Sequence, residues 1–280
     1  PSEFGKIGII IFLSNYRARK ARHLGSAYRG VLKPLGVVGG VTFLVLLGGD
    51  LSTTVITSGV IGALAFVAGV RLRYLVLLAA TGLVLGLTVV IASPERFSRL
   101  TTYQEPEKYQ QDATYQLWHS QLALGSGGLH GMGLTNSRMK RYYLPEATTD
   151  FIVAIIGEET GYLGVMALVV LYAVIVVSCV WLSAVAADRE GMLLCAGVGL
   201  FFGINAFINL GVVSGLLPTT GVTAPLISYG GSSMVASMVC VGVVLSAARI
   251  GEQFHLDRLM HEVRVSPSRE RLFRRREQKA

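Results

Sequence analysis

The sequence predicts an all-α polytopic membrane protein. Of its 280 residues, 52% are hydrophobic and only 15% are charged, and the mean hydropathy is +0.55. Apolar stretches recur along the chain, several of them close to the roughly 20 residues that a helix needs to cross a bilayer. The 33 glycines suit the close helix–helix packing found in lipid. We therefore expect one membrane domain at residues 1–248, followed by a basic cytoplasmic tail at residues 249–280.

Seven spans are expected. In chain order they lie at residues 7–13, 35–49, 51–70, 74–93, 162–182, 192–217 and 233–248. The first is only the remainder of an apolar helix, and the second is shorter than a full span. The chain starts with Pro1 inside a helix-like pattern and carries no signal peptide. We therefore expect N-terminal helices to precede it in the complete protein.

Lysine and arginine gather in three places: residues 17–33, the turn with Arg71 and Arg73, and the tail from Arg249 onward. The positive-inside rule places all three in the cytoplasm. Alternation of the spans then places residues 93–149 and 214–231 on the outer side. Because the basic tail directly follows a span, it favours anionic lipid headgroups over nucleic acid as its partner.

The large outer loop, residues 93–149, is too long for a simple connection, and its second half does not look disordered. Residues 115–124 interleave apolar and polar side chains as an interfacial helix does. The glycine run that follows, residues 125–134, permits left-handed backbone and close approach to a ligand. Ser126, Gly127 and Gly128 are therefore candidate binding residues. The run lacks the strand–loop–helix context of a nucleotide fingerprint, so that interpretation is rejected.

Asp150 stands where this polar loop enters an apolar segment. A carboxylate at the bilayer centre costs roughly 2.5–3.5 kcal/mol on insertion scales, so an acid here is a functional site by default. A helix N-cap is the structural alternative. Two irregular stretches, residues 215–221 and 225–233, lie on the same outer side and must be buried in protein or line a wet cavity. The second of them adds Ser232 and Ser233 to the candidates.

Several motifs resemble the SEDS family of shape, elongation, division and sporulation proteins (FtsW, RodA and SpoVE). The resemblance runs in order from Pro1 to Arg249 and rests on residues 1–6, 125–128, 133–137, 143–147, 149–152, 157–159 and 211–233. The asparagine–serine loop and the Glu158–Glu159 pair look most like the FtsW branch. The resemblance implies a ten-helix fold, of which this chain carries the fourth to the tenth helix.

The resemblance also implies a peptidoglycan glycosyltransferase that polymerises lipid II on the outer face of the bacterial cytoplasmic membrane, in cell division or cell-shape maintenance. Asp150 matches the family's proposed catalytic aspartate, and Glu3 with Lys6 matches its intramembrane acid–base pair. Glu3 and Lys6 share a helix face and, alternatively, only neutralise each other. Thr148, Asn205 and Thr220 depart from the residues common in the family, which leaves the hydrogen bonding around Asp150 open.

The implied reaction transfers a growing glycan from a polyprenyl pyrophosphate to a sugar hydroxyl of lipid II. A positioned carboxylate can take the hydroxyl proton as general base. The pyrophosphate needs cations, and the candidates are Lys6, Arg138, Lys140 and Arg141; the three loop residues are otherwise solvated charges. No metal-ligand cluster is visible in the sequence. A divalent cation, Mg²⁺ or Mn²⁺, would therefore be held mainly by substrate oxygens.

The expected partners are lipid II and its glycan-linked form, a class B penicillin-binding transpeptidase, other division or elongation proteins and membrane lipids. Two functions of other classes stay open. A lipid II flippase would show inverted repeats with paired broken helices, and the sequence shows no such symmetry. A non-enzymatic scaffold for the transpeptidase would not need an acid at the mouth of the membrane.

Overall fold

The computed structural model describes residues 2–19, 33–94, 97–98, 114–142, 144 and 147–265. Within these ranges every regular element is a helix. The helices are α1 (Ser2–Arg19), α2 (Lys33–Leu47), α3 (Leu51–Val67), α4 (Leu72–Ile91), α6 (Tyr115–Gly127), α7 (Met139–Tyr142), α8 (Ile152–Val185), α9 (Arg189–Val213) and α10 (Gly231–Val265). The basic loop at residues 20–32, the first half of the outer loop and the end of the tail lie outside the described residues.

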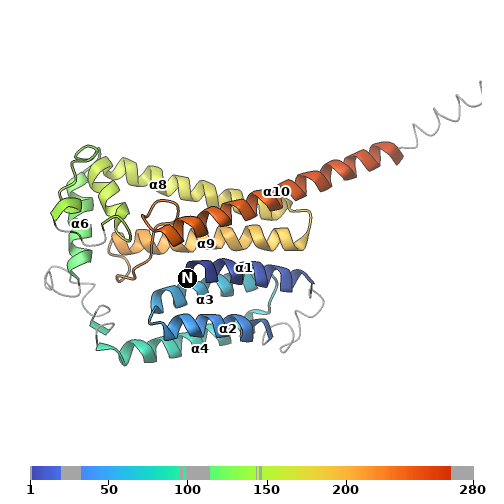
Figure 1. Cartoon of the computed structure of the whole chain (residues 1–280), viewed down its shortest axis with the longest axis horizontal. Helices are drawn as coiled ribbons and strands as arrows, with labels where there is room; N and C mark the ends of the chain where they lie inside the picture. Colours follow the sequence, from blue (N-terminus) through green and yellow to red (C-terminus); the bar gives the residue numbers. More distant parts are fainter. Residues whose placement is uncertain are drawn as a thin grey trace, which may run out of the picture.

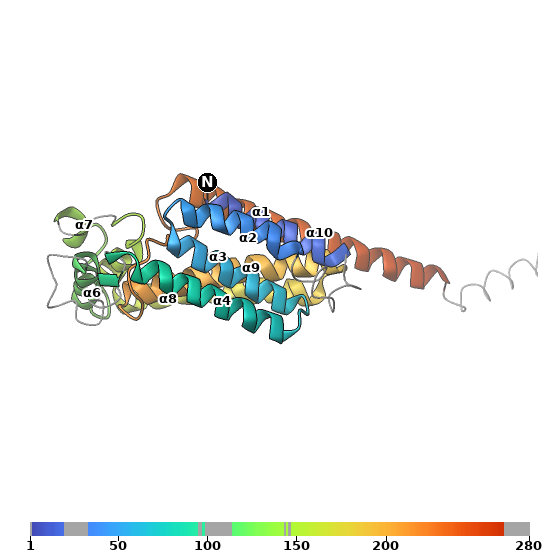
Figure 2. The ribbon, with the colours of Figure 1, turned by 90° about the horizontal axis from the view of Figure 1, so that it is seen from below.

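The long helices form a bundle with α9 at its centre. Helix α9 packs against α1, α3, α8 and α10, and its apolar window is the most buried of the candidate spans. Phe201 and Phe202 of α9 are almost fully buried in the main core cluster, together with Ile10 of α1 and Leu64 of α3. Figures 1 and 2 show α6 and α7 at one end of this bundle, while α10 extends beyond the other end.

The helices confirm the all-α class and support a multi-pass membrane protein. Four are long and apolar enough to cross a bilayer, at Leu72–Ile91, Ile152–Val185, Arg189–Val213 and Gly231–Phe254. Two more, Gly36–Leu47 and Leu51–Val67, are apolar but shorter than a usual span. Helix α1 is longer than the predicted remnant at residues 7–13, because the charged residues that flank the apolar stretch are helical too. Of the seven expected spans, four therefore have the length and hydropathy of a membrane-spanning helix in the described part of the chain.

The predicted boundary at residue 248 falls inside α10, which continues without a break to Val265. Two other helix starts are fixed by carboxylates. Asp50 accepts a hydrogen bond from the Thr53 amide at 2.9 Å, and Asp188 accepts one from the Gly191 amide at 3.2 Å. Both aspartates act as N-caps, of α3 and α9 respectively.

Helix α8 is kinked at Gly161, whose backbone has φ 72° and ψ −168°. A break of this kind frees amide and carbonyl groups that lipid cannot satisfy. The glycine run takes them up through four backbone hydrogen bonds. They run from Tyr162 to Gly128 (2.8 Å), from Leu163 to Leu129 (3.3 Å), from Met132 to Glu158 (2.9 Å) and from Gly133 to Glu159 (3.1 Å). The run therefore completes the backbone pairing of the kinked helix.

The glycine run is predicted to be turn-rich, but its first residues are helical. Gly125 to Gly127 form the last turn of α6, and Gly127 is buried. A Cβ atom at Gly127 would collide with the backbone of Gly157, and one at Gly131 would collide with the carbonyl group of Glu159. Glycine is needed at these two positions because α8 passes so close.

We expect Gly131→Ala to lower the thermal unfolding temperature of the full-length protein strongly. The new methyl group meets backbone atoms that cannot move aside, and φ at this position is +79°. Gly125→Ala is the matched control, because nothing lies within 4 Å of its Cβ position. Alanine in a helix should keep or slightly raise stability at that site. Equal unfolding temperatures for the two variants would contradict the packing role of Gly131.

Candidate functional site

Asp150 lies in the turn that leads into α8 and is half-buried. The N-cap position of α8 belongs to the next residue, Phe151, which makes no side-chain capping bond. A Cβ atom placed on Gly221 would lie 3.5 Å from Oδ2 of Asp150. The carboxylate therefore lies against the bare backbone of the segment between α9 and α10, as the convergence of irregular stretches predicted.

Three successive carbonyl groups in this turn are held by α9 and by the α9–α10 segment. The Asn209 side-chain amide donates to the Asp150 carbonyl at 2.8 Å, and the Ser228 hydroxyl donates to the Thr149 carbonyl at 2.5 Å. The Tyr229 amide donates to the Thr148 carbonyl at 2.9 Å. Because these bonds use main-chain oxygens of the turn, they fix the backbone of Asp150.

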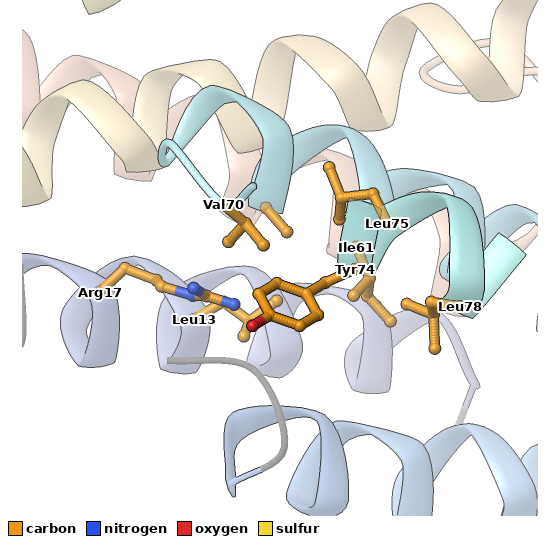
Figure 3. Close-up of a pocket in the computed structure, with 8 residues that line it drawn as sticks. Leu13, Arg17, Ile61, Val70, Tyr74, Leu75 and Leu78 are labelled. Atoms are coloured by element: carbon orange, nitrogen blue, oxygen red, sulfur yellow. The ribbon is translucent and has the colours of Figure 1, made fainter. Parts of the chain in front are cut away.

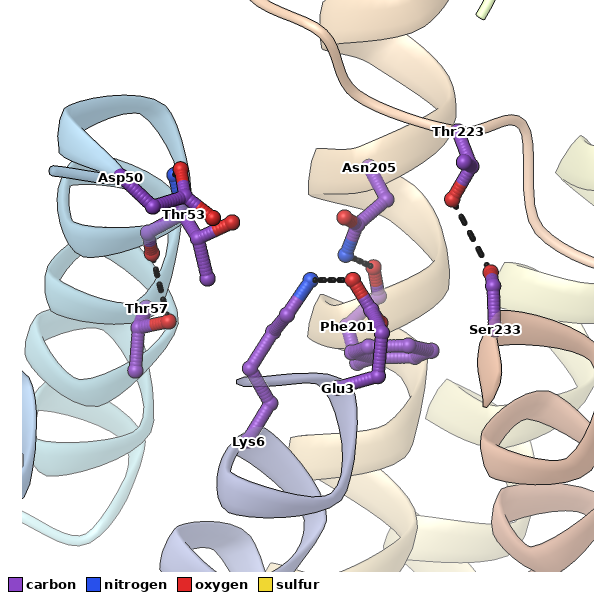
Figure 4. Close-up of polar contacts among 9 residues, drawn as sticks. All are labelled: Glu3, Lys6, Asp50, Thr53, Thr57, Phe201, Asn205, Thr223 and Ser233. Atoms are coloured by element: carbon purple, nitrogen blue, oxygen red, sulfur yellow. Dashed lines mark hydrogen bonds and ion pairs between the residues drawn. The ribbon is translucent and has the colours of Figure 1, made fainter. Parts of the chain in front are cut away.

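The α9–α10 segment is itself tied to three helices. The same Asn209 amide donates to the Val222 carbonyl at 2.6 Å, and the buried hydroxyl of Tyr172 in α8 donates to the Pro225 carbonyl at 2.7 Å. The hydroxyls of Thr223 and Ser233 are 2.9 Å apart, which joins the segment to α10 (Figure 4). These bonds satisfy an irregular backbone that must be buried in protein.

Sequence reasoning missed Asn209, Tyr172 and Ser228 as residues that shape the site. Asn209 is 2% exposed and is the clearest omission, because an asparagine inside an apolar helix is costly unless it is hydrogen-bonded. That rule marks the residue as structurally or functionally important. It does not identify the carbonyl groups that the amide holds, since Asp150 is 59 positions away in the chain.

Glu3 and Lys6 form the predicted ion pair on α1. Their side-chain atoms Oε1 and Nζ are 2.6 Å apart, and the side chains are 20% and 3% exposed respectively. Figure 4 shows the pair between α3, with Asp50 and Thr53, and α9, with Asn205. The Lys6 ammonium also lies 5.6 Å from the centre of the Phe201 ring. The pairing is thus confirmed, while contact with a substrate stays a prediction.

Of the three loop cations, Arg138 directly precedes α7, and Lys140 and Arg141 lie within it. Arg138 and Lys140 are exposed, and the side chain of Arg141 lies outside the described residues. The start of α7 is held by Glu158, which is 1% exposed. Its carboxylate accepts from the Ser137 hydroxyl at 2.5 Å and from the Arg138 amide at 3.0 Å. The expected polar network at Glu158 and Glu159 is therefore present around Glu158.

The other candidate binding residues divide between the two regions. Ser126 is exposed and its hydroxyl donates to the Ala123 carbonyl of its own helix at 2.9 Å. Gly127 and Gly128 join the kink of α8. With a rise of about 1.5 Å per residue, Glu158 lies about 9 Å along α8 from Ile152, the first residue of that helix. Ser233 is buried beside Thr223, and its neighbour Ser232 is exposed. The α9–α10 segment thus contacts Asp150 directly, whereas the glycine run packs further along α8.

Among the residues that the structure describes, no three His, Cys, Asp or Glu side chains gather closely enough to hold a metal ion.

The comparisons with known proteins point to a family. The pattern described as "Cell cycle protein", for FtsW, RodA and SpoVE, matches residues 1–253. Stage V sporulation protein E of Bacillus subtilis is 37% identical over 89% of this chain and 68% of its own length. The probable peptidoglycan glycosyltransferase FtsW of Idiomarina loihiensis is 39% identical over 87% of this chain and 60% of its own length. The chain thus spans about two thirds of the length of these relatives.

Solved structures agree with that likeness. One is a chain from work on the structural coordination of polymerization and crosslinking by a peptidoglycan synthase complex. It is 28% identical with a TM-score of 0.66, over 89% of this chain and 69% of its own length. The rod shape determining protein RodA of Thermus thermophilus is also 28% identical, with a TM-score of 0.58 over 89% of this chain and 65% of its own length.

Proposed function

Because the chain belongs to the SEDS family of FtsW, RodA and SpoVE proteins, we propose that it is part of a peptidoglycan glycosyltransferase that uses lipid II. The observation that carries this proposal is the fixed Asp150 turn. Three bonded carbonyls hold its backbone, and its carboxylate lies against Gly221. A reacting carboxylate needs this kind of positioning, because small displacements from the productive geometry are costly in rate.

In this reaction the Asp150 carboxylate takes the proton of the acceptor sugar hydroxyl on lipid II. The hydroxyl oxygen forms the new bond to the anomeric carbon of the growing glycan, and the bond from that carbon to the polyprenyl pyrophosphate breaks. The proton ends on Asp150 and the electron pair leaves with the pyrophosphate. A general base of this type contributes typically about 10²–10⁴-fold to a rate.

The pyrophosphate is assigned to the cations Arg138, Lys140 and Arg141, which bind phosphate oxygens by charge-assisted hydrogen bonds. Ser232 is exposed at the start of α10. The Lys6–Glu3 pair is more buried and lies between α3 and α9 (Figure 4). The glycine run packs on the kink of α8. It therefore supports the substrate site indirectly, by holding that kink in place. Direct substrate contact at Gly127 and Gly128 stays a prediction.

In this proposal the reacting end faces the outer side of the bacterial cytoplasmic membrane. Helices α6 and α7 and the Asp150 turn lie at the end opposite to the basic extension of α10, which the positive-inside rule assigns to the cytoplasm (Figure 1). Lipid II and the lipid-linked glycan can reach that end from the membrane. The proposed protein partner is a class B penicillin-binding transpeptidase, which is supported by the likeness to a chain of a peptidoglycan synthase complex.

Full-length protein supplied with lipid II, with and without its transpeptidase, tests the proposal. We expect glycan chains that a muramidase digests. A flippase would instead move lipid II across a vesicle membrane without forming polymer, and a scaffold would yield polymer only when a partner with its own polymerase activity is added. Either of those two results, obtained with a folded preparation, would overturn the assignment.

We expect Asn209→Ala to reduce glycan formation and to lower stability. Its loss leaves the Asp150 and Val222 carbonyls without their donor, and a buried unpaired group costs roughly 1–3 kcal/mol. Ser214→Ala is the control, because Ser214 is exposed and bonds only to the end of its own helix. Product formation and unfolding temperature are measured for both. An unchanged amount of product from Asn209→Ala would show that Asn209 does not position Asp150.

A further inference from the structure

Arg17, near the end of α1, is a buried charge with no acidic partner among the described residues. The residue is 3% exposed, and its Nε and Nη1 atoms have no hydrogen-bond partner in the described part of the chain. Taking a guanidinium out of water without a counter-charge costs several kcal/mol. A ligand that supplies oxygen acceptors at this point would remove that cost.

Arg17 faces a small pocket between α1, α3 and α4. Figure 3 shows the Arg17 guanidinium and the Tyr74 hydroxyl directed into the same space. The remaining lining is aliphatic, formed by Leu13, Ile61, Ala65, Val70, Leu75 and Leu78. The pocket therefore combines a polar corner with an aliphatic wall.

A second guanidinium reaches the same corner. The Arg73 side chain donates from Nη2 to the Tyr74 hydroxyl at 3.0 Å and lies 4.7 Å from the centre of its ring. Two acids at the start of α9 have other roles, since Glu190 accepts from Asn15 at 2.8 Å and Asp188 caps α9. Two arginines without an acidic partner in the described residues favour a phosphate, whose oxygens match the guanidinium fork.

The pocket lies at the basic end of the bundle. Arg189 at the start of α9 donates to the Ala68 carbonyl at 2.9 Å, next to the pocket residue Val70, whereas Asn209 near the end of α9 holds Asp150. At about 1.5 Å per residue, these two points on α9 are about 30 Å apart. The apolar window of α4, Leu72–Ile91, has no buried residues among the described part of the chain.

We propose that this pocket binds the phosphate of an anionic phospholipid from the cytoplasmic leaflet, with Arg17 as the inner anchor and Arg73 at the rim. Tyr74 orients Arg73, and one acyl chain follows the aliphatic wall toward Leu75 and Leu78. The site is separate from the proposed reacting end. It gives the bundle a stability that depends on the lipid around it.

The test uses the purified full-length protein in detergent mixed with phosphatidylglycerol or with phosphatidylcholine. We expect phosphatidylglycerol to raise the unfolding temperature of the wild type by several degrees more than phosphatidylcholine does, because a ligand that binds the folded state stabilises it. Arg17→Gln should lose most of this difference, and in phosphatidylcholine it should be at least as stable as the wild type. Arg19→Gln is the matched control, since Arg19 is exposed at the same helix end.

Two further arms identify the ligand. Inorganic phosphate added with phosphatidylcholine should give no stabilisation, and native mass spectrometry should find fewer phosphatidylglycerol molecules retained on Arg17→Gln than on Arg19→Gln. If Arg17→Gln does not fold, Arg17→Lys is used instead, because lysine keeps the charge but lacks the two-pronged guanidinium group. It should retain an intermediate number of phosphatidylglycerol molecules. A full lipid response in the variant, an equal loss of stability in both lipids, or stabilisation by inorganic phosphate alone would overturn the proposal.

Discussion

Asp150→Asn should reduce glycan formation from lipid II by about 10²–10⁴-fold, the range attributed to a positioned general base. The amide has nearly the same shape as the carboxylate but cannot take the proton of the sugar hydroxyl. Folding should be unaffected, because the bonds from Asn209, Ser228 and Tyr229 reach main-chain oxygens that the substitution leaves in place. The measurement is muramidase-sensitive product formed per minute by full-length protein at equal concentrations.

The same chemical change at another aspartate supplies the control. Asp188→Asn alters the N-cap of α9, at the end of that helix opposite to Asn209 and the Asp150 turn. Asparagine caps a helix as well as aspartate does. We expect this variant to keep its activity and its unfolding temperature. Product at a wild-type rate from a folded Asp150→Asn enzyme would show that Asp150 is not the base, whatever the other residues of the site contribute.

Much of the fold could be predicted from apolar stretches alone. Residues 74–93 and 192–217 were expected as spans, and they coincide closely with α4 and α9. This works because membrane helices satisfy their own backbone groups, so length and hydropathy decide where they lie. The start of the span expected at residue 162 is also physically sensible, since α8 changes direction at Gly161.

The role of the glycine run could not be predicted in the same way. Glycines indicate left-handed backbone or the close approach of another group, and the structure has both. The glycine pattern does not identify the group that comes close. The neighbour proved to be the kink of α8, joined through residues about 30 positions away, such as Gly128 with Tyr162. The contacts of Asn209 with Asp150 are more distant still. Local sequence patterns carry little information about such pairings.

The candidate site was predicted in part for a related reason. A carboxylate at the mouth of a span is conspicuous because of its cost, so Asp150 was singled out from the sequence. The residues that position it are neutral amides and hydroxyls, which cost less and occur in many membrane helices. Their importance became visible only when the acceptors of Asn209 and Ser228 were known.

The second large effect is expected at the ion pair of α1. Glu3→Gln should destabilise the full-length protein more than Lys6→Met does, because it leaves the nearly buried Lys6 ammonium without its counter-charge. Breaking a fully buried pair costs about 3–5 kcal/mol, and the 20% exposure of Glu3 should place the single variants below that range. The double variant Glu3→Gln with Lys6→Met should be more stable than Glu3→Gln alone, since no unpaired charge remains.

Thermal unfolding of the wild type, both single variants and the double variant gives the coupling, which for groups in contact is about 0.5–3 kcal/mol. Arg19→Met removes an exposed charge from the same helix and should change little, which controls for net charge. Losses that simply add would mean that the pair seen at 2.6 Å contributes no interaction. Product formation by the double variant separates the two roles left open for the pair. If Lys6 and Glu3 contact substrate as predicted, the double variant should recover stability relative to Glu3→Gln without recovering polymerisation. If the pair is purely structural, the double variant should recover both.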